Sequence, residues 1–140
     1  MKVTVDMVGR GVKDGLRTTW ELAKVIIPVY FLITVLKYTP LMDLMVKAFE
    51  PVTKLVGLPG EAALPIVIAN LLTIYPAIPA IIAFPFTPKE ITIISTMILL
   101  CHSLLVEGAI AKKAGTTAWK VVVLRICTAL TAGIILNLVL

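Results

Sequence analysis

The sequence has few charged residues, one histidine and two cysteines. Only 15% of its 140 residues are Asp, Glu, Lys or Arg, whereas 59% are hydrophobic. A soluble domain of this length could not bury that much apolar surface. One histidine excludes a metal site built from several imidazoles of a single chain, and no residues have the spacing of a catalytic triad or a phosphate-binding loop. We therefore expect no enzyme activity, no cofactor and no metal.

Other features argue against a cleavable signal peptide and against nucleic-acid binding. Six of the first 17 residues are charged, so the N-terminus lacks the apolar core of a cleavable signal peptide. Cys101 and Cys127 lie in apolar stretches without a CxxC spacing, as expected for free cysteines that pack in helices. The net charge is +5, but the basic residues flank apolar stretches and only 6% of residues are aromatic. This distribution is typical of membrane topology signals, and we expect no nucleic-acid partner.

Four stretches contain no charged residue. They are residues 25–36, 62–86, 91–106 and 126–140. With their flanks, such runs reach the roughly 20 residues that a helix needs to cross the hydrocarbon core. The sequence therefore predicts an all-α, multi-pass integral protein of the cell membrane (inner or plasma), surrounded by the lipid bilayer.

The pattern predicts three spans, at 20–38, 88–111 and 117–140. It also predicts two amphipathic helices in the interface, at 3–18 and 41–56, because charged and apolar residues alternate there at helical spacing. All of these elements belong to one domain, residues 1–140.

Residues 61–86 are apolar enough for a bilayer but are interrupted. Within them, PIVIANLLTIYPAIPA contains three prolines and the polar residues Asn70, Thr73 and Tyr75. One helix of 26 residues would cross, whereas two halves meeting near Ile74–Pro79 would be too short and would form a re-entrant hairpin. Backbone groups freed at such a break must be buried in protein or line a cavity, as in transporter sites.

The distribution of basic residues favours the hairpin. Leaving aside Lys24 and Arg125, which fall within spans, a full crossing divides the basic residues five to six between the two sides. A hairpin divides them seven to four, with the N-terminus on the richer side. By the positive-inside rule we expect the re-entrant hairpin and a cytoplasmic N-terminus, while the full crossing stays open.

Two motifs resemble the nucleoside-recognition, or Gate, domain family, which includes the spore maturation proteins A and B. They are GLPGEAALPIVIANLLTIYPAIPA (57–80) and CHSLLVEGAI (101–110). The resemblance implies half of an inverted-repeat transporter core, because larger members are similar in having two such units in opposite orientations. It further implies a second unit from another chain. The hairpin lacks the glutamine- and glutamate-bearing tip of the nucleoside transporters.

Five residues are candidates for binding a small solute or ion. His102, Ser103 and Glu107 lie within about one and a half turns, and an ionisable group at membrane depth suggests a functional site. They can face one cavity only where the helix unwinds. Asn70 and Thr73 lie near the expected hairpin tip. The alternative roles are helix-to-helix hydrogen bonds for these polar residues and, for Glu107, contact with the interface.

The sequence thus favours a transport subunit whose midplane site forms between two Gate units. The alternative is a structural or assembly protein that binds a membrane partner without transporting anything. We expect an antiparallel homodimer, because the chain contains one complete unit, or else a pair with a second Gate-like subunit.

Overall fold

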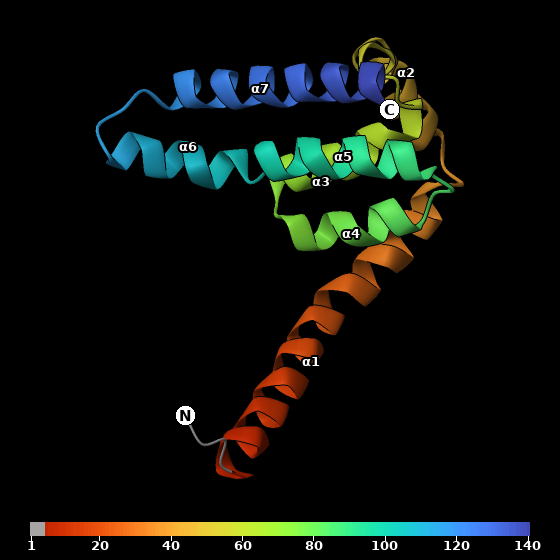
Figure 1. The fold of residues 1–140 in the computed structure, drawn as a ribbon. Coiled ribbons are helices and arrows are strands. Elements are labelled where there is room, and N and C mark those ends of the chain that lie inside the picture. The colour runs from red at the N-terminus through yellow and green to blue at the C-terminus, as the bar shows by residue number, and fades with distance from the viewer. Residues whose placement is uncertain (1–4) are drawn as a thin grey trace.

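The computed structural model describes residues 5–140, which form helices and no strands (Figure 1). The helices are Val5–Leu36 (α1), Pro40–Leu55 (α2), Ala63–Leu71 (α3), Ile74–Ile82 (α4), Pro88–Leu100 (α5), Leu104–Lys113 (α6) and Ala118–Val139 (α7), and a single 3-10 turn covers Gly60–Ala62.

Three segments are long and apolar enough to cross a membrane. They are Asp6–Leu36, Pro88–Lys113 and Ala118–Val139. A further helical pair, Pro40–Leu55 with Gly60–Leu71, is bent by 99°. The three segments confirm the predicted all-α membrane fold with three spans.

The spans and half-length helices lie side by side. The α5–α6 pair runs next to α7, α3 packs against α5 and α6, and α4 lies between α3 and α1 (Figure 1). The helix α2 lies across one end of this group, near the C-terminus, and we call this the α2 end (Figure 1). The loop that joins α6 to α7 lies at the other end.

The segment 61–86 forms a hairpin of two short helices. Each of α3 and α4 has nine residues, or roughly 14 Å of helix, which is half of what a crossing requires. The chain leaves the α2 end in α3, turns at Leu72–Thr73 and returns in α4 (Figure 1). This is the geometry of a re-entrant element.

The turn of the hairpin comes before Pro76 and Pro79, so the prediction of a break near Ile74–Pro79 was wrong. Pro76 lies in the first turn of α4, where a helix has no internal acceptor for the backbone N–H. The helix then continues through Pro79. Pro76 therefore suits the start of α4 and does not mark its interruption.

The predicted boundaries differ from the structure at two other places. The separate elements expected at 3–18 and 20–38 are one helix, α1, over its described residues. The hydroxyl of Thr19 donates to the Gly15 carbonyl within the helix at 2.9 Å, so nothing stops the helix there. The span expected at 88–111 is instead broken between α5 and α6.

The helix α2 is amphipathic, as predicted for an interfacial helix. Its charged face includes Glu50 and Lys54, whose side chains form an exposed ion pair at 2.7 Å. The Lys54 ammonium holds the pKa of the Glu50 carboxyl below its ordinary value. On the other face, Met42 and Thr53 are buried against the bundle.

The α2 end is held together by lysines that bond to the carbonyl ends of helices. The ammonium of Lys89 donates to the Asn137 carbonyl at 2.9 Å, and that of Lys37 donates to the Ala83 carbonyl at 2.6 Å. Both satisfy carbonyls that the last turn of a helix leaves free. Together they connect α7 and α4 to neighbouring parts of the chain.

Candidate functional site

The α5–α6 span is interrupted in its middle by three residues. The helix α5 ends at Leu100, Cys101 is extended, and Ser103 has a φ of 51°, in the left-handed region. The Ser103 N–H donates to the Ala69 carbonyl of α3 at 2.8 Å. This backbone hydrogen bond therefore links the break in the span to the last turn of α3, the first helix of the hairpin.

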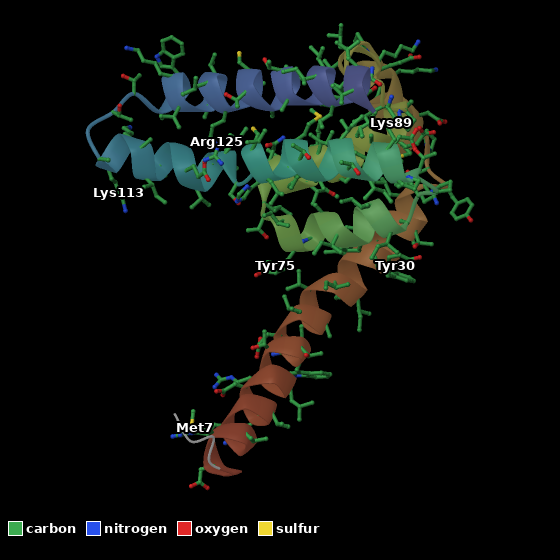
Figure 2. All side chains as sticks on the ribbon, viewed as in Figure 1. Met7, Tyr30, Tyr75, Lys89, Lys113 and Arg125 are labelled. Atoms are coloured by element: carbon green, nitrogen blue, oxygen red, sulfur yellow. The ribbon has the colours of Figure 1, made fainter. Side chains whose placement is uncertain are left out.

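Arg125 of α7 reaches across to this break. Its Nε donates to the Leu100 carbonyl, the last of α5, at 3.2 Å, and its guanidinium pairs with the Glu107 carboxylate of α6. Figure 2 shows Arg125 between α7 and the α5–α6 span, whose ends are marked by Lys89 and Lys113. Arg125 thus gives a hydrogen bond to the Leu100 carbonyl, which the end of α5 leaves free, and places a positive charge beside the Glu107 carboxylate.

The pair of Arg125 and Glu107 is partly enclosed. Their side chains are 27% and 26% exposed. An unpaired charge at membrane depth is costly, and a partner of opposite charge offsets part of that cost. The sequence favours snorkelling of Arg125 to the interface over a pair with Glu107 or with an anionic ligand. The structure instead shows the pair with Glu107. The alternative role of Glu107 was contact with the membrane interface, and the residue forms this ion pair instead.

His102 lies inside the break. Its Nδ1 is 3.1 Å from the Ile98 carbonyl, and because a carbonyl only accepts, Nδ1 carries the proton of this bond. In the neutral ring, Nε2 is then left as an acceptor. His102 Nε2 can thus accept a hydrogen bond while the ring is held by α5.

The structure brings three of the five candidate residues together. His102 and Ser103 form the break and Glu107 follows in the first turn of α6. Asn70 is the residue after Ala69 in α3 and lines a cavity together with Cys101. Its Oδ1 is buried and accepts no hydrogen bond from the described residues. Thr73 is exposed at the hairpin tip and its side chain makes no capping bond to α4. Asn70 therefore lies in the cavity wall and Thr73 at the exposed tip, and neither belongs to the Glu107–Arg125 pair.

The backbone groups at the break could not be identified from the sequence. The carbonyls of Ala69 and Leu100 belong to ordinary apolar residues, and only the termination of α3 and α5 makes them available. Arg125 carried a signal, since it is an ionisable residue inside an apolar stretch. Over residues 5–140, no group of three or more His, Cys, Asp or Glu side chains could hold a metal ion.

These features define a class: a multi-pass membrane protein in which a half-length helical hairpin meets a broken span. The family model described as "Gate: Nucleoside recognition" matches residues 19–117. The chain therefore belongs to the Gate, or nucleoside-recognition, family. The matched region contains the hairpin and the break but ends before Arg125.

A relative supports the same assignment. The chain is 40% identical over 129 residues to the uncharacterized membrane protein YvoD of Bacillus subtilis (strain 168). The alignment covers 92% of this chain and 41% of the relative, so the chain spans about two fifths of that protein's length. No solved structure matches.

Proposed function

We propose that this Gate domain is one half of a membrane transport unit that moves a small polar solute or ion. The observation that carries the proposal is the junction of the broken span with the hairpin, where Glu107 and Arg125 form an ion pair. Broken helices and charged residues at membrane depth are how transporters build substrate sites. Family membership supports the same reading.

The chemistry of the junction suits a polar cargo. A cation or an ammonium group would compete with Arg125 for Glu107, and an anionic group would compete with Glu107 for Arg125. Binding of either kind would open the ion pair and release the Leu100 carbonyl that Arg125 also holds. The site would then change with its cargo, as alternating access requires.

The exposed hairpin tip supports a second unit. Leu72 and Tyr75 are 54% and 53% exposed, and the polar Thr73 lies between them. Backbone groups of the Leu72–Thr73 turn would face lipid if nothing covered them, at several kcal/mol each. We propose that an inverted second copy covers this tip and completes the site.

The length of the relative is consistent with such pairing. If 129 residues are 41% of it, the relative has 129/0.41, or about 315 residues, which is room for two units of this size. In the pair proposed for this chain, one copy has a cytoplasmic N-terminus, as the seven-to-four charge count favours, and the other is inverted.

Uptake into vesicles tests the proposal. We expect the full chain in proteoliposomes to take up at least one of three probes: uridine, sodium ions or inorganic phosphate. His102→Ala and Glu107→Gln should each lower that uptake about tenfold or more, a loss of roughly 1.4 kcal/mol in the transport step. The melting temperature of His102→Ala should stay near that of the parent protein. Glu107→Gln removes the charge opposite Arg125 but keeps an acceptor for it, so it should lower the melting temperature less than Arg125→Leu does.

A control and an alternative complete this test. Thr128→Val changes an exposed hydroxyl of α7 that bonds only to its own helix, at the Leu124 carbonyl, and should transport normally. Uptake no greater than in protein-free vesicles for all three probes would instead favour a non-transporting assembly protein. The observation that favours that alternative is that Glu107 and Arg125 already neutralise each other.

A further inference from the structure

The helix α1 is longer than a membrane crossing requires. Its 32 residues make roughly 48 Å of helix, whereas a crossing takes about 20 residues. Trp20 is exposed and lies where an interfacial aromatic residue begins the crossing, so the residues before it lie outside the hydrocarbon core. They project away from the helices that lie side by side, with Met7 near the far end (Figure 1, Figure 2).

The projecting part of α1 has one charged face and one apolar face. At about 100° of rotation per residue, the seven charged residues in 6–24 fall within an arc of about 100°. Val8, Val12 and Leu16 lie on the opposite side of the helix and are 54–68% exposed. All residues from 6 to 21 are exposed, so this apolar face packs against nothing among the described residues.

The residues at the border of the apolar face suit a lipid surface. Lys13 and Trp20 lie beside this face, about 80–100° around the helix from Val12. A lysine stem and an indole ring in such places reach from the acyl chains into the headgroup layer. Because α1 continues into a span, the lipid surface is always within reach of its projecting part.

The helix can bend between its span and its projecting part. The bond from the Thr19 hydroxyl to the Gly15 carbonyl, at 2.9 Å, is of the kind that bends helices. Gly15 has no side chain, and nothing lies within 4 Å of the place where a Cβ would be. The projecting part can therefore tilt toward the membrane plane without losing a tertiary contact.

We propose that residues 6–17 of α1 dock on an anionic lipid surface. The apolar face enters the boundary between headgroups and acyl chains, and Arg10 and Arg17 contact lipid phosphates. The net charge of this segment is +1, from three basic and two acidic residues. The docking goes beyond the proposed transport function and does not depend on it, because the Glu107–Arg125 pair involves no residue of α1.

Spin labels on the two faces of α1 form the test. Full chains that lack Cys101 and Cys127 carry the label at Val12→Cys or Asp14→Cys, in nanodiscs of phosphatidylcholine and phosphatidylglycerol. Oxygen dissolved in the lipid should relax the label at position 12, and a water-soluble nickel chelate should relax it about tenfold less than the label at position 14. Relaxation of position 12 by the chelate would mean a helix free in water. Protection of position 12 from both agents would mean a protein partner or a second copy, and either result would overturn the proposal.

A double variant tests the contact with the headgroups. Arg10→Gln/Arg17→Gln changes the net charge of residues 6–17 from +1 to −1. The ratio of chelate-shielded to chelate-exposed label at position 12 should then fall about tenfold or more, since each basic residue near an anionic surface contributes about fivefold. Lys112→Gln/Lys113→Gln removes the same charge from the last turn of α6 and is the matched control, with no change expected. An unchanged ratio in Arg10→Gln/Arg17→Gln, or for the parent chain in pure phosphatidylcholine, would overturn the proposal.

Discussion

Replacing Arg125 by leucine is expected to lower the free energy of unfolding by about 2–4 kcal/mol. The change leaves Glu107 without its partner and the Leu100 carbonyl without a donor. Loss of one member of a fully buried pair costs more, and the 26% exposure of Glu107 reduces the effect. Denaturation of the purified protein by sodium dodecyl sulfate, followed by circular dichroism, measures the change.

The matched double variant separates the pair from simple packing. In Arg125→Leu/Glu107→Leu no charge is left without a partner, so most of the lost stability should return. The two single substitutions would then be strongly non-additive. Additive losses would mean that the two side chains do not depend on each other, which would contradict the ion pair as the element that holds the break.

Replacing Ser103 by proline is the second substitution with a large expected effect. Proline fixes φ near −65°, whereas Ser103 has a φ of 51°. It also removes the N–H that donates to the Ala69 carbonyl, the link between the broken span and the hairpin. We expect a loss of about 3 kcal/mol or more in the free energy of unfolding.

Glycine at the same position is the control. It adopts positive φ readily and keeps the N–H, so Ser103→Gly should stay within about 1 kcal/mol of the parent protein. The same denaturation measurement compares the two. If glycine and proline destabilised equally, the left-handed conformation and its backbone bond would not be what position 103 requires.

The spans could be predicted because lipid imposes a simple rule on composition. The charge-free runs at 91–106 and 126–139 lie within the segments Pro88–Lys113 and Ala118–Val139, which have the lengths that a bilayer needs. A break within 61–86 was also predicted from its prolines and polar residues, although Pro65, Pro76 and Pro79 lie inside the two helices and not at the turn. Family membership then followed from the motifs around the hairpin and the break.

The location of each break could not be predicted, for two physical reasons. Proline is acceptable in the first turn of a helix, so Pro76 could begin α4 as readily as interrupt a longer helix. Conversely, Ser103 has no strong local preference for positive φ. Its conformation is fixed by a distant carbonyl, that of Ala69, which becomes available only when α3 and α5 pack together.

The ion pair of Glu107 and Arg125 shows a similar limit of what the sequence can predict. Spacing within one helix relates Ser103 to Glu107, but the partner of Glu107 is 18 positions away on another helix. The sequence offered Glu107 as one possible partner of Arg125, but it favoured snorkelling of Arg125 to the interface. Only the packing of α6 on α7 brings the two side chains together.

Cross-linking between two copies in native membranes tests the central claim, an antiparallel pair of Gate units, most directly. Trp20 and Tyr38 lie about one membrane thickness apart on and just after α1, and are 66% and 87% exposed. Single cysteines at these positions, in differently tagged chains that lack Cys101 and Cys127, are co-expressed and treated with a short bifunctional maleimide. The account predicts cross-links between position 20 of one chain and position 38 of the other. Exclusive 20-to-20 and 38-to-38 products would show a parallel pair and contradict it.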